Sequence, residues 1–323
     1  MRLFTILFIV IAVFLTNIPE PGAQERTAAG ENKAPAARSG LFDQEILFGP
    51  LLADPRNPVY SLGLRFGDEA YDGYAYTSTG TWTGVVGQNR IFWTFSFGDR
   101  IGIYQWDDVF GGKLKVSLEG AAWSIFALRF VRPSGEYFTS MINIDFRIGV
   151  PITWSNGVFG LKLSVYHQSS HLGDELMHQM ELHGEPSDRL NPSSEVVDAA
   201  VSWQIIPQIR AYLLLGVFFS TDDTYPIAPF FFEWGGEFRP WKQLRAGRGA
   251  YWEPYAAFHF RNWQEYGFLF DGTFVLGIEI IPRNPAAKYR FRFSGEYHHG
   301  FSLEGQFSNN PADYFGIAFA AGF

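Results

Sequence analysis

Long stretches of this chain alternate between apolar and polar residues. Between residues 142 and 148 the apolar residues are Ile142, Ile144, Phe146 and Ile148, and those between them are Asn143, Asp145 and Arg147. The stretches around residues 159–165, 197–205 and 289–298 follow the same pattern. A period of two is the signature of a β-strand with two unlike faces. Beyond the first 20 residues no uninterrupted apolar run is long enough for a spanning helix, so the sequence indicates an all-β protein.

Alternation fits a soluble barrel and a membrane barrel alike, and three features favour the membrane. Several stretches reach ten residues, the length that crosses a bilayer when tilted. Trp and Tyr residues gather near their ends, as in interfacial girdles. The chain ends on one apolar face, formed by Phe315, Ile317, Phe319, Ala321 and Phe323. We therefore predict a transmembrane up-and-down antiparallel β-barrel of about 12 strands. A soluble periplasmic barrel of the lipocalin type is the alternative.

The N-terminal 58 residues divide into three parts. Residues 1–23 carry Arg2 and an apolar run, which predicts a cleaved signal peptide, with an uncleaved anchor as the alternative. Residues 24–40 are small and polar, as in a flexible linker. Residues 41–58 are apolar but rich in proline, which excludes a sheet interior and predicts a short plug or lid. The barrel is expected to occupy residues 59–323.

Composition limits the partners that we expect. The net charge is −8, and a nucleic-acid partner would need a basic surface. The absence of cysteine excludes disulfides and Cys-ligated metal sites. Aromatic residues make up 18% of the chain, more than a soluble core needs. The expected location is the bacterial outer membrane after export. The expected partners are the lipid bilayer, lipopolysaccharide and, through the C-terminal strand ending at Phe323, the barrel-assembly machinery.

One face of the barrel is expected to line a narrow lumen. The strand parity places charges of both signs there, namely Arg65, Lys115, Arg147, Lys162, Arg290 and Arg292 with Glu119, Asp145, Asp198, Glu237, Glu279 and Glu296. Paired charges in a narrow barrel are expected to form a salt-bridge network rather than an open pore.

The segment 166–175 concentrates groups that can carry chemistry. His167 and Ser169 share the parity of Leu163 and Val165, the face expected to meet lipid. An imidazole near a hydroxyl is the start of a base–nucleophile pair. Either carboxylate that follows, Asp174 or Glu175, is expected to orient the imidazole or to join a Ca²⁺ site of loop oxygens. The alternative is a binding or loop-anchoring cluster that includes Ser170 and His171.

Two resemblances rest on these segments. Residues 51–56 (LLADPR) and 167–175 (HQSSHLGDE) resemble an uncharacterised bacterial family, domain of unknown function 1207. This resemblance implies an exported outer-membrane barrel over about residues 41–323 and no activity. His167-x-Ser169 is also similar to the His-x-Ser pair of outer-membrane lipid A deacylases. Those enzymes continue with Asn-Ala, whereas Ser170-His171 follows here, which weakens the transfer of catalytic roles.

Two functions follow as alternatives. The first is a non-enzymatic role in transport or envelope structure, indicated by the mixed charges of the lumen. The second is an outer-leaflet lipid-ester hydrolase with His167 as general base and Ser169 as nucleophile.

Overall fold

The protein is described from a computed structural model. It describes residues 40–42, 45–71, 91–131, 136–174, 176–177, 191–240, 244–246, 250–282 and 290–322. The expected signal peptide, all of the expected linker except Gly40, and Phe323 lie outside these ranges. The chain separates into two units, 1–36 and 37–323, and the second holds every described residue.

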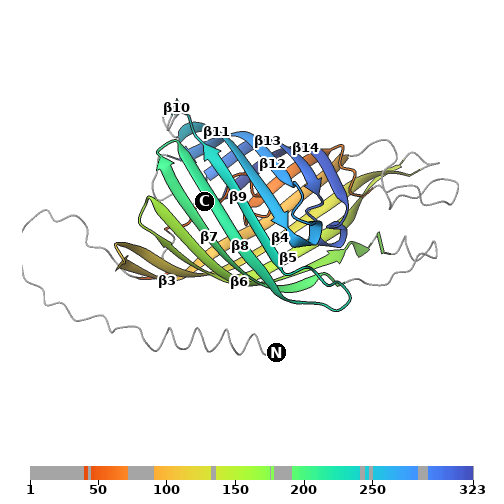
Figure 1. The fold of residues 1–323 in the computed structure, drawn as a ribbon. Helices are drawn as coiled ribbons and strands as arrows, with labels where there is room; N and C mark the ends of the chain where they lie inside the picture. The colour runs from red at the N-terminus through yellow and green to blue at the C-terminus, as the bar shows by residue number, and fades with distance from the viewer. Residues whose placement is uncertain are drawn as a thin grey trace, which may run out of the picture. The chain divides into compact units, whose positions relative to one another are not determined.

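Twelve strands form a closed antiparallel barrel (Figure 1). They are β2 (Tyr60–Phe66), β3 (Ile91–Val109), β4 (Gly112–Val131), β5 (Glu136–Ser155), β6 (Phe159–Leu172), β7 (Ser193–Ile206), β8 (Ile209–Thr221), β9 (Phe230–Phe238), β11 (Ala250–Trp263), β12 (Gly272–Pro282), β13 (Arg290–Phe301) and β14 (Pro311–Gly322). Each pairs with the next along the chain, and β14 pairs with β2 to close the barrel. Two short strands, β1 (Gly40–Leu41) and β10 (Leu244–Ala246), pair with β3 and β11. The predicted fold class and strand number are confirmed.

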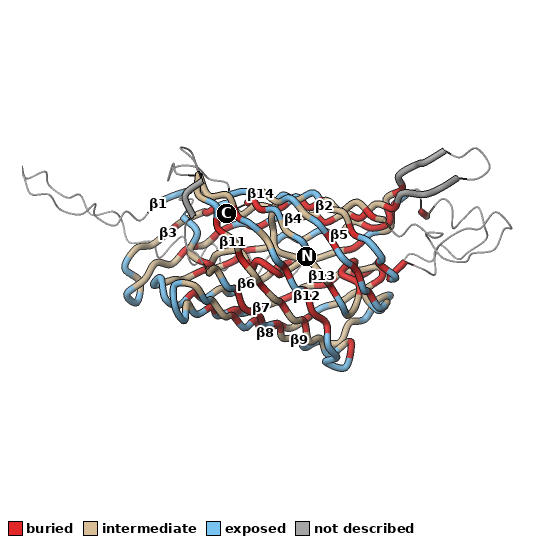
Figure 2. The backbone as a smooth tube through the Cα atoms, turned by 90° about the horizontal axis from the view of Figure 1, so that it is seen from above, coloured by how far each residue is buried: buried red, intermediate tan, exposed pale blue. Residues whose placement is uncertain are grey.

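The two faces of the barrel have the distribution expected in a bilayer. Large apolar side chains are exposed on the outward face, for example Leu276 (69%), Phe315 (65%) and Ile148 (63%). Charged and polar side chains are buried on the inward face, as the alternation of burial along each strand shows (Figure 2). A soluble barrel would show the reverse arrangement. Most of the predicted lumen charges are buried, although Arg290 lies near a strand end with 45% of its side chain exposed.

A β-bulge breaks the alternation in β5. The pairing of β5 with β4 shifts by one residue between Asn143 and Met141, which leaves Ile142 as the extra residue. Ile142 is fully buried and packs with Ile125 and Phe92 in an inward apolar cluster. Strict alternation would place Ile142 on the outward face with Ile144, so the bulge reverses its side.

Residues 47–58 cross the inside of the barrel. Phe48 and Leu51 are buried against inward residues of β6, β7 and β8. The guanidinium of Arg210 donates to the carbonyl oxygens of Gly49 at 3.0 Å and Pro50 at 3.1 Å. The Leu52 amide donates to Glu237 at 3.1 Å. Because three prolines prevent strand pairing here, side chains of the wall satisfy these backbone groups instead.

The two ends of the barrel differ in the length of their connections. At the short-turn end, β3–β4, β5–β6 and β7–β8 are joined by two or three residues, whereas residues 239–249 separate β9 from β11 and residues 283–289 separate β12 from β13. At the long-loop end, the connections 173–192, 222–229, 264–271 and 302–310 are longer. Loop 302–310 contains the 3₁₀ helix η3 (Gly305–Phe307), whose backbone bonds to Asp145 and Ser170 inside the barrel. Among the described residues no helix is both long and apolar enough to cross a membrane.

Candidate functional site

The strongest candidate site lies on the outward face of β6, close to the long-loop end. His167, Ser169 and His171 share the outward face with Leu163 and Val165, as their parity predicts. The directly paired residues are Ile148 and Glu195 for His167, and Phe146 and Ser193 for Ser169. A histidine and a serine therefore lie two residues apart on the outward face of β6, next to the apolar residues Leu163 and Val165. We call His167, Ser169 and Glu195 the rim cluster.

Glu195 on β7 supplies the carboxylate of the rim cluster. His167 Nδ1 lies 3.0 Å from Glu195 Oε1, and the Nδ1–H tautomer donates this hydrogen bond. His167 is 41% exposed and Glu195 only 25%, so the carboxylate is the more shielded partner. A register shift between Glu195 and Val196 in the pairing with β8 marks a bulge beside this carboxylate. Bulges of this kind aim side chains next to functional sites.

The hydrogen bond to Glu195 leaves the other ring nitrogen of His167 available. With Nδ1 protonated, Nε2 is unprotonated and can accept a proton. Ser169 lies two residues further along the same face, about 7 Å along the strand. No hydrogen bond joins the two side chains within the described part of the chain, and catalytic hydrogen bonds often tighten only when substrate binds. Glu195 Oε2 is buried and has no hydrogen-bond partner among the described residues.

Among the described residues Glu195, and not Asp174, is the carboxylate that contacts His167. Asp174 begins the long connection after β6 and is exposed, and in the described ranges no contact joins it to His167. Glu175 lies outside the described residues. Within those residues no group of three or more His, Asp or Glu side chains is placed to hold a metal ion. The Ca²⁺ site therefore stays a sequence-based expectation.

Ser170 and His171 separate onto opposite faces. Ser170 points inward with 3% exposure, and its hydroxyl donates to Asn143 at 3.0 Å and accepts from the Gln306 amide at 3.1 Å. It thus anchors loop 302–310 to the wall. His171 points outward against the ring of Phe146 at 6.0 Å. Of the two residues expected in a binding cluster, only His171 shares the face of the rim cluster.

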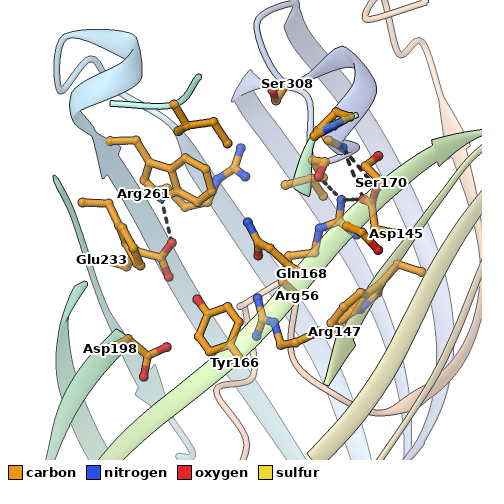
Figure 3. Close-up of a pocket in the computed structure, with 18 of the residues that line it drawn as sticks. Arg56, Asp145, Arg147, Tyr166, Gln168, Ser170, Asp198, Glu233, Arg261 and Ser308 are labelled. Atoms are coloured by element: carbon orange, nitrogen blue, oxygen red, sulfur yellow. Dashed lines mark hydrogen bonds and ion pairs between the residues drawn. The ribbon is translucent and has the colours of Figure 1, made fainter. Parts of the chain in front are cut away.

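A second candidate is a cavity of about 100 Å³ inside the barrel (Figure 3). Arg147 projects into it, with its guanidinium 4.5 Å from the Tyr166 ring centroid and 5.3 Å from that of Trp123. Glu233 accepts a hydrogen bond from Trp263 at 2.9 Å on the opposite wall. Arg56, from the segment that crosses the lumen, contacts Asp145 and the carbonyl oxygen of Leu303. The cavity is small and is lined by charges of both signs. We interpret it as a packing defect between the charged side chains that fill the lumen, not as a ligand site.

An ionic cluster lies where loop 302–310 enters the barrel. Glu304 accepts hydrogen bonds from Arg65 at 3.0 Å and from Ser302 at 3.0 Å, and also contacts Tyr71. Burial raises the pKa of Glu304, but Arg65 and Arg56 outweigh it and hold this pKa at about 2. Burial raises the pKa of Asp68, next to the same arginine, to about 7. These contacts fix loop 302–310 to the barrel wall.

Glu195 was missed by reasoning from the sequence, although a signal was present. It shares the parity of Val197, Ala199 and Val201, so it is a carboxylate on the face expected to meet lipid. A charge there is as unusual as His167 on the neighbouring strand. Two polar outliers at the same end of adjacent antiparallel strands would have identified the pair.

Comparisons with known proteins support the fold. The outer membrane phospholipase (OMPLA) dimer with bound calcium from Salmonella typhi matches with a TM-score of 0.51 and 10% identity, covering 83% of this chain and 93% of that chain. The outer membrane phospholipase A from Escherichia coli matches with a TM-score of 0.51 and 10% identity, covering 86% and 94%. At this identity the likeness shows the outer-membrane barrel fold alone. No curated protein matches the chain.

A family model matches residues 15–323. It describes a protein of unknown function, DUF1207, and it includes both sequence segments that resembled that family. The chain therefore belongs to the DUF1207 family.

Proposed function

We propose that this protein is an outer-membrane hydrolase that cleaves ester bonds of outer-leaflet lipids. The observation that carries the proposal is the hydrogen bond between His167 and Glu195 on the outward face, with Ser169 two residues away on the same face. A serine, a histidine and a carboxylate in this order are the parts of a nucleophile, a base and an orienting group. Unrelated folds use the same three parts, so the barrel is no obstacle.

Each residue has a defined task in this mechanism. Glu195 holds the imidazole with Nδ1 protonated, so that Nε2 can take the proton of Ser169. The Ser169 oxygen then attacks the ester carbonyl, and the leaving alcohol receives that proton from His167. Water, activated by the same nitrogen, releases the acid from the acyl-enzyme and restores Ser169. Ser169 must turn toward His167 for this step.

The position of the rim cluster selects the substrate class. His167 pairs with Ile148. The pair Val165 and Val197 is two residues further from the long-loop end, and all four residues face outward. In membrane barrels the longer loops face the outside of the cell, so the cluster would lie at the level of outer-leaflet headgroups and esters. The expected partners, bilayer lipid and lipopolysaccharide, both present acyl esters at this level. The likeness to barrels named phospholipases is consistent with such a substrate.

A second candidate function is a structural role in the envelope without catalysis. The occupied lumen favours it over transport, because residues 47–58 and the ionic pairs around Glu237 and Asp145 cross the inside of the barrel. In this case the rim cluster would only fix the ends of β6 and β7.

Lipid mass spectrometry separates the two candidates. Cells would produce the wild-type protein, Ser169→Ala, Glu195→Ala or His299→Ala, and phospholipids and lipid A would be profiled. His299 offers a matched control, because it pairs with Asp313 at 3.2 Å on the outward face of another wall but has no serine two residues away. We expect acyl-chain loss with the wild type and His299→Ala only. Identical profiles in all four strains would contradict the hydrolase.

A further inference from the structure

An apolar groove of about 450 Å³ lies on the outward face beside the rim cluster. Val197 and Ala199 of β7 and Val217 of β8 belong to it on one side. Phe232 of β9 and Phe268 of loop 264–271 stand on the other side. Its lining is almost entirely apolar, although it opens onto the same surface as His167 and Glu195.

The groove begins where the rim cluster ends. Val197 is two residues from Glu195 on the same face of β7, and Ala199 is two residues further. Each step moves about 7 Å away from the long-loop end, toward the middle of the barrel wall. Val197 pairs with Val217 and Ala199 pairs with Leu215, so the groove residues of β7 and β8 lie at the same heights along the barrel wall. An acyl chain attached to an ester at Ser169 would run in this direction.

The far side of the groove is held in a strained shape. Phe268 has a φ of 58°, in the left-handed region that bulky residues rarely occupy. Its ring stacks on Phe232 at 5.9 Å, and its carbonyl oxygen accepts a hydrogen bond from Asn262 at 3.3 Å. Such strain persists only when surrounding contacts enforce it, and it gathers at ligand clamps. Phe268 is still 46% exposed, so its open side faces the groove and the membrane.

We propose that this groove binds the acyl chain of the lipid whose ester is cleaved at Ser169, and that Phe268 forms its outer wall. This inference rests on the proposed hydrolase function. Apart from Gly216, Ala199 is the smallest residue that lines the groove, and a larger side chain at position 199 would block the acyl chain's path along β7. The groove thus favours lipids with long chains over short soluble esters.

A chain-length series tests the groove with the full-length protein. Purified wild type, Ala199→Phe and Ala256→Phe would be assayed on p-nitrophenyl butyrate and palmitate. Each methylene that loses its binding surface costs about fourfold in kcat/KM. We expect Ala199→Phe to lower kcat/KM for palmitate at least tenfold, the effect of losing about two methylenes, and to leave kcat/KM for butyrate unchanged. Ala256→Phe, the same change on the outward face of β11, should alter neither.

A second variant acts outside the strands. Phe268→Ala removes the wall without touching the barrel, and it should also lower hydrolysis of palmitate but not butyrate. If both variants retain the wild-type chain-length profile while Ser169→Ala is inactive, the proposal that the groove binds the acyl chain is wrong, and the proposed hydrolase function is retained. An equal loss on both esters in both variants also overturns the groove. If the wild type cleaves neither ester nor a phospholipid vesicle, the hydrolase fails and the groove fails with it.

Discussion

Two histidine–carboxylate pairs lie on the outward face near the long-loop end, on different walls of the barrel. His167 and Glu195 join β6 to β7 at 3.0 Å, and His299 and Asp313 join β13 to β14 at 3.2 Å. Two residues beyond His167 is Ser169, whereas two residues beyond His299 is Phe301. Glu195 is 25% exposed and Asp313 is 50% exposed.

This difference shows which features make the first pair a candidate site. A histidine–carboxylate contact occurs four times among the described residues, two of these on the outward face, so by itself it does not identify a site. The nucleophile and the shielding of the carboxylate occur together only at the first pair among the described residues, whereas an apolar groove adjoins both pairs. Partial burial strengthens the hold of Glu195 on the imidazole, because the charge is less screened by water. The second pair is an internal control that the chain itself provides.

The largest effect is expected for the nucleophile. Ser169→Ala should lower ester hydrolysis by roughly a millionfold, because removing one member of a catalytic unit removes nearly all of its effect. His299→Ala should leave the rate unchanged. Initial rates on a phospholipid substrate in detergent would measure both. Wild-type activity in Ser169→Ala would contradict the role of Ser169 as nucleophile, and the first histidine–carboxylate pair would then differ from the second in no catalytic respect.

A smaller loss is expected when only the orienting charge is removed. Glu195→Gln keeps the shape of the side chain but favours the wrong tautomer of His167, which should lower the rate about ten-thousandfold. Asp313→Asn makes the matched change at the second pair and should have no effect. The same kinetic assay applies. Equal rates for both variants would show that Glu195 does not orient the base.

A change in stability without a change in activity is expected at the loop cluster. Glu304→Gln removes the closer of the two carboxylates that Arg65 contacts, the other being Asp68 at 3.6 Å, and should cost about 3 kcal/mol of unfolding free energy. The pKa of Glu304 in the fold is about 2, below the ordinary value of 4.5, so its contribution is complete above pH 4.5 and is lost as the pH falls through 2. The difference in Tm between wild type and variant should therefore shrink in acid.

Thermal unfolding in detergent at pH 7 and pH 3 measures this difference. Asp68 acts in the opposite direction, since its pKa is raised to about 7 and its stabilising effect is lost as the pH rises from 3.8 to 7. The negative charge of Glu304 is one of the causes that raise the pKa of Asp68, so the variant should also lower that pKa. A Tm difference that grows in acid would contradict the assignment of Glu304.

The smallest effect is expected at Asp174. Asp174→Asn should alter hydrolysis less than twofold, because Glu195 already occupies Nδ1 of His167. The assay with phospholipid, repeated with added Ca²⁺ or a chelator, tests both roles expected from the sequence. A large loss in Asp174→Asn would return the orienting or Ca²⁺-binding role to this residue.

The sequence predicted most of the barrel because alternation is a local property. The inward positions of Glu119, Asp198 and Arg292 and the outward positions of Phe315 and Ile317 follow from parity alone. Ile142 could not be placed, because a bulge depends on the pairing partner in β4. The path of residues 47–58 could not be derived either, since Arg210 and Glu237 are distant in sequence.

For the candidate site, the sequence identified the two residues on β6 but not the carboxylate on β7. His167 and Ser169 were found because both lie on one strand face. Glu195 is 28 residues from His167, and its role depends on the register of β6 with β7. Proximity in sequence favoured Asp174 and Glu175 instead. Register across strands is the information that a single sequence lacks.

The most direct test of the account is covalent labelling of the folded protein with a fluorophosphonate, which reacts with activated serines. Purified wild type, His167→Ala and His299→Ala would be labelled in detergent, digested and mapped by mass spectrometry. The account predicts one modified serine, Ser169, in the wild type and in His299→Ala, and none in His167→Ala. An unlabelled wild-type protein, or equal labelling of Ser169 in all three proteins, would contradict it.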